Sequence, residues 1–443
     1  MLKRKILLSK AIAEADHVVR ATLSNSAGTT VKGVVCGIFP PKRATDAIKM
    51  HFQPTPSQAN RLNFALMAAR LPELALKATL RHGNRRLIFS ADRVWCTSIS
   101  TGHRYDIPFV SDFTGTSDNL YIKHSGVDAP ARRRGTFFLT PNPLINTAML
   151  IVPSYDGNVR VHHVLRPRFS LRDGVRLTFT KHFNYRKVGR DESVSSSELV
   201  AEFRLTGNAF DVPSVSEDLD SFLLLTSFAT RHRCVCLGWT YTDPRGNIVN
   251  YYRRNIAIPK DREISNHDTL IDMPEFPKFI RTSYRRFGKF SHKDQFNSAI
   301  YPLISDVDKT TEMSYFSLFS ALEGALLFAD QTFRLFPRGH QTLHTRWGLF
   351  KSRFNVDVSD LWPMTDGTSG ITLTQLRNKV GHGEHLNPAQ TLALLYARQH
   401  LRWILERVLL TLLGWPISKS KVGPALLGRQ HAYREWAQAR TAF

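Results

Sequence analysis

The chain has 443 residues, of which 42% are hydrophobic and 11% aromatic, so it is long enough for two or three folded domains and is not a disordered polycation. Lysine and arginine total 60 against 37 aspartate and glutamate residues, which gives a formal net charge of +23. A field of that sign attracts polyanions. Nucleic acid is therefore the first partner class to consider and an anionic membrane surface the second.

The amino terminus, MLKRKILLSKAIAEADHVV, starts like a signal peptide, but Lys10, Glu14 and Asp16 interrupt the apolar run too early for secretion. The longest apolar candidate for a membrane span, LRWILERVLLTLLGW, contains three charged residues. The 4 cysteines are too few for a disulfide framework in a chain of this length, which fits a reducing cytosol. The sequence therefore predicts a cytoplasmic protein without membrane contact.

Residues 27–260 alternate apolar and polar side chains, with β-branched and aromatic residues between clusters of Pro, Gly and Asp, a pattern typical of strands. The stretch CVCLGWTYTDPRGNIVNYYRRNIAI predicts a β-hairpin that turns at DPRGN. Before it, SVSEDLDSFLLLTSFATRHR predicts a helix that packs on the sheet, with Ser214 or Ser216 as its N-cap. Residues 1–261 are therefore interpreted as a β-rich sensing or regulatory region, with two subdomains as an option.

The pattern changes to helical periodicity near residue 262. Successive helical patterns are MPEFPKFIRTSYRRFGKF, DQFNSAIYPLIS, TEMSYFSLFSALEGALLFADQTFRLF, HTRWGLFKSRF, LTQLRNKV and PAQTLALLYARQHLRWILERVLLTLL. A short basic amphipathic helix is expected in LLGRQHAYREWAQAR. The predicted fold class is α+β, with the β-rich region followed by an all-α helical bundle over residues 262–443.

A polar stretch in this second half, LRNKVGHGEHLNP, combines groups suited to cutting a phosphodiester. Histidine is the side chain suited to moving protons to or from ribose and leaving-group oxygens at neutral pH, which makes His382 a candidate. Arg377 stays charged and can hold non-bridging phosphate oxygens. Five helical positions rotate a side chain by about 140°, so the two would not share a helix face. A helix end near Val380, with Gly381 as C-cap, would let His382 turn back toward the arginine or toward another subunit.

The stretch LTQLRNKVGHGE resembles the R-N-x-x-x-H motif of HEPN domains, a helical ribonuclease superfamily, and the likeness covers roughly residues 270–415. It implies an all-α HEPN bundle in which Arg377 binds phosphate, His382 is the general acid/base and Asn378 orients one of them. It also implies an endoribonuclease that needs no metal or other cofactor, works as a homodimer with a composite cleft, and leaves a 2′,3′-cyclic phosphate and a 5′-hydroxyl.

The layout, with a basic β-rich region before the helices, is similar to the ApeA-type HEPN proteins of bacterial anti-phage defence. That likeness implies cleavage of RNA, with tRNA as a candidate, during abortive infection. Constitutive cleavage would be toxic, so a phage-derived trigger or an inhibitory partner protein is expected. The alternative is a non-catalytic nucleic-acid-binding protein that keeps the HEPN bundle as a dimerisation scaffold.

Two further residues are candidates for supporting the motif. Glu323 lies in the apolar stretch ALEGALLF, where a carboxylate needs a cationic partner, and Arg377 would serve. A purely structural pair with another arginine is equally compatible with this position. His385 follows the motif directly and is the second candidate.

Basic clusters interleaved with aromatic residues recur at RHGNRRLIF, APARRRGTFF, HFNYRKVGR and FIRTSYRRFGKF. That combination suits single-stranded nucleic acid, where arginines follow phosphates and rings stack on bases. Solvated loops and strand ends would explain any one cluster taken singly. The candidate RNA-binding residues are Arg132, Arg133, Arg134, Arg285, Arg286 and Lys379.

Two stretches of the sequence contain possible metal ligands. The stretch HGEH has neither the H-E-x-x-H nor the H-x-x-E-H spacing of zinc enzymes. His232, Cys234 and Cys236 alternate on one strand, where a buried strand face is the simpler interpretation. No phosphate-binding glycine loop occurs, so the sequence predicts neither a metal nor a nucleotide cofactor.

Overall fold

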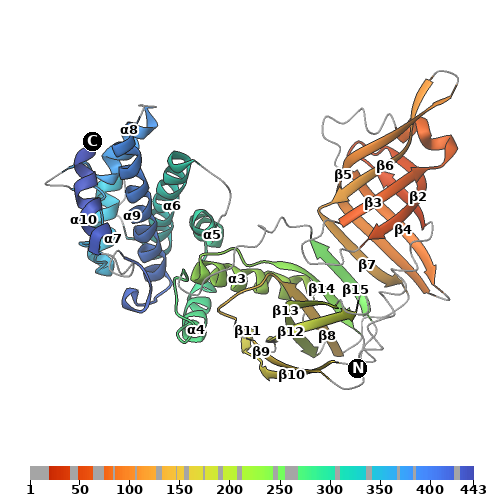
Figure 1. The fold of residues 1–443 in the computed structure, drawn as a ribbon, viewed down its shortest axis with the longest axis horizontal. Helices are drawn as coiled ribbons and strands as arrows, with labels where there is room; N and C mark the ends of the chain where they lie inside the picture. The colour runs from red at the N-terminus through yellow and green to blue at the C-terminus, as the bar shows by residue number, and fades with distance from the viewer. Residues whose placement is uncertain are drawn as a thin grey trace. The chain divides into compact units, whose positions relative to one another are not determined.

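The computed structural model of the chain separates into two compact units (Figure 1), which are described one by one. The first comprises residues 1–141, 145–219 and 235–261, and the second residues 142–144, 220–234 and 262–443. The structure describes residues 19–39, 48–62, 74–82, 85–104, 107–125, 132–145, 147–153, 159–172, 175–187, 193–206, 212–242, 248–254, 268–304, 310–335, 342–366, 370–382, 386–423 and 430–443.

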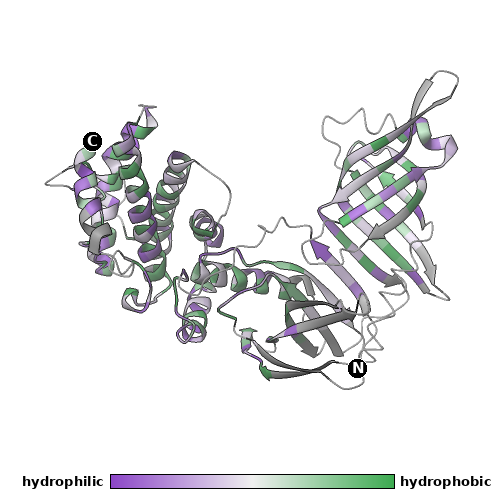
Figure 2. Ribbon diagram, viewed as in Figure 1, coloured by the Kyte–Doolittle hydropathy of each residue, from purple (hydrophilic) through white to green (hydrophobic). Residues whose placement is uncertain are grey.

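The first unit contains a closed six-stranded antiparallel β-barrel, with β5 paired to β4 on one side and to β6 on the other. Its strands are β1 (Val19–Ser24), β2 (Thr30–Phe39), β3 (Ile48–Pro54), β4 (Leu74–His82), β5 (Arg85–Arg104) and β6 (Ile107–Ser117). Buried and exposed positions alternate along β3, as the period-two pattern requires. Figure 2 shows the matching alternation of hydrophobic and hydrophilic bands along the barrel strands. The apolar side chains that face inward, among them Phe52, Phe89 and Phe113, form one core.

The barrel is joined to further strands through β5. The first half of β5 pairs with β7 (Asn119–Ser125), whereas the second half, from Val94 onward, pairs with β6. Ser117 is fully buried at this change of neighbour, and its hydroxyl lies 2.7 Å from the carbonyl oxygen of Asp92. The backbone group that loses a ladder partner at the junction is thereby satisfied.

The sheet continues beyond β7 in the order β15, β14, β8, β13, β12 and β11. These strands are β8 (Arg132–Leu139), β11 (Arg168–Arg172), β12 (Val175–Lys187), β13 (Ser193–Thr206), β14 (Cys236–Thr242) and β15 (Ile248–Arg254), while β9 (Ala148–Pro153) and β10 (Val159–Leu165) form a separate pair. The predicted hairpin is confirmed, because β14 and β15 pair antiparallel. Gly238 has φ of 151° at a bulge in β14, a conformation that favours glycine.

The predicted helix before the hairpin is α3 (Val212–Thr230), and the division between the two units falls within it. The predicted N-cap is wrong. Ser214 and Ser216 lie inside the helix, and Ser216 is buried. The helix therefore begins before both serines, at Val212.

The second unit is built on α6 (Thr311–Phe333) and α9 (Pro388–Leu412), which pack against each other. The other helices are α4 (Phe276–Phe287), α5 (Lys293–Ile304), α7 (Leu343–Phe354), α8 (Leu373–Gly381) and α10 (Gln430–Ala439), and each matches a helical pattern of the sequence. The second half of α9 is buried all round, as expected of a central helix. Within the part of the chain that the structure describes, no helix combines the length and apolar character needed to cross a bilayer.

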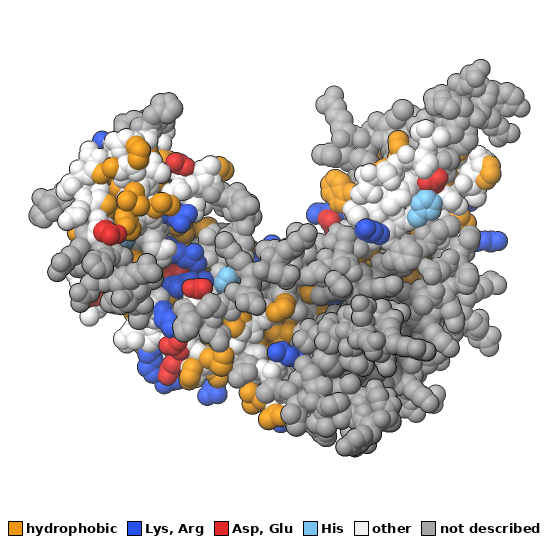
Figure 3. All heavy atoms as spheres, in the orientation of Figure 1, with side chains coloured by type: hydrophobic (Ala, Val, Ile, Leu, Met, Phe, Trp, Pro, Cys, Tyr) orange, Lys and Arg blue, Asp and Glu red, His pale blue; other side chains and the backbone are white. Residues whose placement is uncertain are grey.

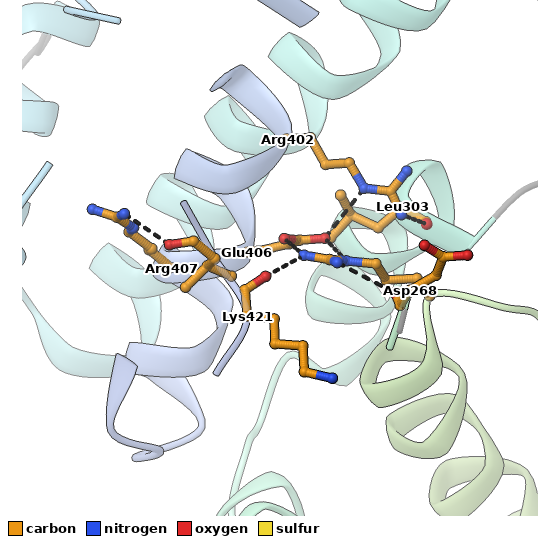
Figure 4. Close-up of polar contacts among 8 residues, drawn as sticks. Asp268, Leu303, Arg402, Glu406, Arg407 and Lys421 are labelled. Atoms are coloured by element: carbon orange, nitrogen blue, oxygen red, sulfur yellow. Dashed lines mark hydrogen bonds and ion pairs between the residues drawn. The ribbon is translucent and has the colours of Figure 1, made fainter. Parts of the chain in front are cut away.

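A buried ionic network ties the end of α3 to α9 inside this unit (Figure 4). Glu406 is fully buried and accepts hydrogen bonds from Arg231 at 2.8 and 2.6 Å and from Arg402 at 3.2 Å. Burial opposes the charge of Arg231, but the Glu406 carboxylate raises the pKa of this guanidinium above its ordinary value. Arg231 sits just after α3 with φ of 58°, a left-handed position that usually holds glycine. The ion pair of Arg231 with Glu406 explains why an arginine occupies this left-handed position.

The fold class predicted from the sequence, a β-rich region followed by an all-α HEPN bundle, is wrong. The β-rich half contains a closed six-stranded barrel with additional strands, which the prediction did not include. The helical half is not a separate C-terminal bundle either. It takes in residues 220–234 and 142–144, which precede the predicted boundary at residue 262. Whether the two units are the predicted sensing and nuclease domains stays a prediction.

Among the described residues of the helical unit, His400 is a buried histidine. His400 packs against the rings of Trp362, Trp403 and Trp436, and its Nδ1 accepts a hydrogen bond from the main-chain N–H of Trp362 at 3.1 Å. Burial lowers the pKa of His400 to about 3; the charge of Asp360 raises this pKa and that of Arg407 lowers it further. The imidazole is therefore neutral at physiological pH.

We expect this histidine to make the stability of the protein depend on acid. Its folded pKa lies below the ordinary value of 6.5, so between pH 6.5 and 3 the unfolded chain binds a proton that the folded chain does not. The free energy of unfolding therefore decreases as the pH is lowered through this window, by up to about 1.4 kcal/mol per pH unit. In His400→Asn the amide oxygen replaces Nδ1 as the hydrogen-bond acceptor. The free energy of unfolding of this variant, measured with urea, should no longer show the contribution of His400 to the pH dependence. The control His344→Asn, at an exposed site, should keep it.

Candidate active site on helix α8

Helix α8 carries the motif, and its own sequence fixes how it is oriented. Thr372 and Gln375 form a capping box that starts the helix. Leu373, Leu376 and Val380 recur at helical spacing and are buried. The intervening Arg377 and Asn378 are therefore left on the exposed side.

Side chains of α6 support this exposed face from beneath. The buried Tyr315 donates a hydrogen bond from its hydroxyl to the carbonyl oxygen of Leu373 at 2.7 Å, which holds the first turn of α8 against α6. Burial raises the pKa of this phenol, with Arg377 opposing the shift, so it remains a donor. The guanidinium of Arg377 lies 5.6 Å from the ring centroid of Phe319 and donates to the side-chain oxygen of Asn378 at 3.3 Å.

The C-terminal end of α8 differs from the prediction. Gly381 is the last helical residue and does not act as a left-handed C-cap. The helical hydrogen bonding instead runs one residue further, because the N–H of His382 donates to the carbonyl oxygens of Asn378 and Lys379 at 3.1 and 3.2 Å. His382 is exposed. The turn that would have brought it back toward Arg377 is therefore absent from this described segment.

The supporting residues proposed from the sequence do not join the motif within the described residues. Glu323 is half-buried on α6, and in this part of the chain it forms no ion pair with Arg377. The arginine instead contacts Phe319 and Asn378. His385 lies outside the described residues.

The predicted RNA-binding residues fall in both units. Arg132, Arg133 and Arg134 are on β8, where only their backbone is described. Arg285 is exposed in the last turn of α4, and the half-buried Arg286 lies with its guanidinium 5.6 Å from the centroid of Phe333. Of the predicted set, only Lys379 lies on α8 itself.

The side chains that the structure describes contain no cluster of three His, Cys, Asp or Glu residues that could hold a metal ion. Glu384 and His385 are outside these residues. Cys234 is buried and within reach of the side chains of Asn142, Thr230 and Ser227, and burial raises the pKa of its thiol. Cys234 therefore behaves as a packed, protonated thiol.

Two features of the site were missed by the sequence reasoning. The aromatic residues Tyr315 and Phe319 were given no role in the sequence analysis, although their spacing of four places both on the face of α6 that meets α8. The other is the segment after α10. There the main-chain oxygen of Phe443 accepts a hydrogen bond from Lys379 Nζ at 3.4 Å. No local pattern signals that contact, since the two residues are far apart in the chain.

Comparison with known proteins gave no match: no family model, curated protein or solved structure matches the chain.

Proposed function

We propose that this chain is a metal-independent endoribonuclease whose catalytic groups are Arg377, Asn378 and His382. The observation that carries the proposal is the arrangement on α8: an arginine held over Phe319 and bonded to Asn378, with an exposed histidine at the helix end. The resemblance of LTQLRNKVGHGE to the HEPN motif supports it, and so does the net charge of +23, which favours RNA as substrate.

The proposed reaction is transfer of the phosphodiester to the neighbouring ribose hydroxyl. The 2′-oxygen forms a bond to phosphorus, the bond from phosphorus to the 5′-oxygen breaks, and the products are a 2′,3′-cyclic phosphate and a 5′-hydroxyl. His382 transfers protons at these oxygens. Arg377 holds the non-bridging oxygens and offsets the charge that develops on them. Asn378 fixes the guanidinium by accepting its hydrogen bond.

A second copy of the chain would complete the site. On one helix Arg377 and His382 point about 140° apart and are separated by about 7.5 Å along the axis, so one protomer does not place both groups on one face. Surface composition favours association: α9 exposes Leu392 (50%) and Leu395 (37%), and α6 exposes Met313 (59%). Figure 3 shows hydrophobic side chains gathered over α8 and α9.

In the cell we place this activity in the cytoplasm, where RNA, with tRNA as a candidate, is accessible to it. The similarity of layout to ApeA-type proteins supports a role in anti-phage defence by abortive infection. A toxic ribonuclease needs restraint, supplied in this proposal by a partner protein or relieved by a phage-derived trigger. Co-purification of a stable companion, or activation by a phage lysate, would reveal which; a constitutively active, harmless protein would contradict both.

The proposal is tested by incubating the purified chain with total RNA and with tRNA in EDTA, followed by analysis of the new ends. Products with 2′,3′-cyclic phosphates and 5′-hydroxyls are expected, because the side chains supply the acid, the base and the phosphate contact. The rate per protomer should fall on dilution below the dimer dissociation constant. Cleavage that stops in EDTA would contradict the mechanism, and full activity of a monomer would contradict the composite site. RNA binding without any product would favour the non-catalytic binder.

A further inference from the structure

An open hollow of about 680 Å³ lies beside the motif, between α8 and the turn η6 (Arg440–Ala442). Its polar lining includes Gln375, Asn378, Lys379, Arg440 and Thr441. None of the described residues that line it has a carboxylate side chain. The side chains of the hollow therefore offer amide, hydroxyl and cationic groups to an anion, while the main-chain oxygen of Phe443, which also lines it, accepts a hydrogen bond from Lys379.

Arg440 is the unusual member of this lining. Its Nε and Nη2 atoms are buried and have no hydrogen-bond partner within the described part of the chain. Burial also lowers the pKa of this guanidinium, which reflects the cost of removing its charge from water. Arg440 as a whole is half-buried, and its enclosed donors without an acceptor are unfavourable. An anion in the hollow, attracted by the guanidinium charge, would offset part of that cost.

The position of Arg440 is fixed by backbone contacts with the segment that precedes α8. The N–H of Ile371 donates to the carbonyl oxygen of Arg440 at 3.2 Å. Gly370 has φ of 72°, and a Cβ added there would lie 2.8 Å from the same oxygen, so the two segments approach closely. Lys379 is held over the ring of Phe443 at 6.0 Å, and its ammonium is already bonded to the main chain. Arg440 is thus the cation left to meet a ligand.

We propose that this hollow binds a backbone phosphate of the RNA strand next to the one that is cut, with Arg440 as its anchor and Asn378 as the shared boundary with the catalytic groups. This inference rests on the proposed function. It adds a contact that would set the register of the strand across α8. A guanidinium suits it because planar, paired donors match the oxygens of a phosphate.

The test measures binding of a short fluorescently labelled single-stranded RNA in EDTA, with all variants made in the His382→Ala background so that cleavage does not interfere. Arg440→Gln should weaken binding roughly 10-fold. It should also reduce the slope of log affinity against log salt by about 0.7, the value for one lost phosphate contact on a single strand. Arg440→Lys should recover most of the slope, because the charge returns. The matched control Arg353→Gln removes an exposed arginine outside the hollow and should leave the slope unchanged.

Equal affinity and equal slope for Arg440→Gln and its parent would overturn the subsite, as would loss of affinity with an unchanged slope. The subsite would also be refuted if Arg353→Gln weakened RNA binding as much as Arg440→Gln, because the loss would then come from the lower net charge of the protein. Thermal melting of Arg440→Gln and Arg440→Lys shows whether either variant is misfolded. If Arg440→Gln is misfolded, the comparison of Arg440→Lys with the parent replaces it. Cleavage by the parent chain is scored separately. A chain that binds through Arg440 without cutting RNA would refute the nuclease alone.

Discussion

Substituting His382 by alanine, or Arg377 by alanine, is expected to abolish RNA cleavage while the protein stays folded. Each group is assigned a step that contributes about 10²- to 10⁴-fold to the rate, the histidine through proton transfer and the arginine through charge stabilisation. Both side chains are exposed, so their removal leaves no cavity. The measurement is the initial rate of cyclic phosphate formation, with circular dichroism melts to verify the fold.

Matched controls separate the motif from surface charge in general. His344→Ala and Arg353→Ala remove an exposed histidine and an exposed arginine of the same unit, and both should cut RNA at the parental rate. If His382→Ala and Arg377→Ala were as active as these controls, the motif would have no part in the mechanism. Asn378→Ala should fall between the two groups, because Arg377 keeps its contact with Phe319 when it loses the amide.

Glu406→Gln is expected to lower the free energy of unfolding by about 3 to 5 kcal/mol, the usual loss when one member of a buried ionic network is removed. The substitution preserves the volume of the side chain, so the loss comes from charge. Arg231 would remain largely buried without its anion, and the amide group would face the donors of two arginines. The measurement is urea unfolding followed by far-UV circular dichroism, which reports on the helices.

The control for this substitution is Asp366→Asn, which removes an acidic group from an exposed pair with His344 at 3.5 Å. Exposed pairs contribute at most about 1 kcal/mol, so the unfolding curve should hardly move. Similar losses for Asp366→Asn and Glu406→Gln would mean that burial does not strengthen the network. A double variant with Arg231→Gln should recover part of the stability, since it removes the uncompensated charge.

The helices could be predicted from the sequence because the spacing of apolar residues that defines a helix lies within the helix itself. In α8 the spacing of Leu373, Leu376 and Val380 predicts both the helix and the face that Arg377 presents. The hairpin β14–β15 was predicted for the same reason, since its turn lies between its two strands. The N-cap of α3 was wrong because serine also occurs inside helices, and composition alone does not say which role it takes.

The barrel could not be predicted, because the alternation of apolar and polar residues identifies strands but not which strands pair with each other. Closure depends on the pairing of β3 with β6, in which the partner residues are more than sixty positions apart and which no local pattern specifies. The hollow beside α8 has the same origin. It brings Lys379 near Phe443 and Ile371 near Arg440, contacts made by residues more than sixty positions apart.

The ionic network also bears on the modularity of the chain. Residues 262–443 contain the helical elements α4 to α10, yet the carboxylate buried at their centre is paired not only with Arg402 of α9 but also with Arg231, which lies upstream of them. The N–H groups of Leu270 and Ile271 are likewise satisfied by the carbonyl oxygen of Ala229. Residues 262–443 therefore do not form an independent module that could be exchanged between proteins at residue 262. Any recombination that preserves their fold has to carry the last turns of α3 along with them.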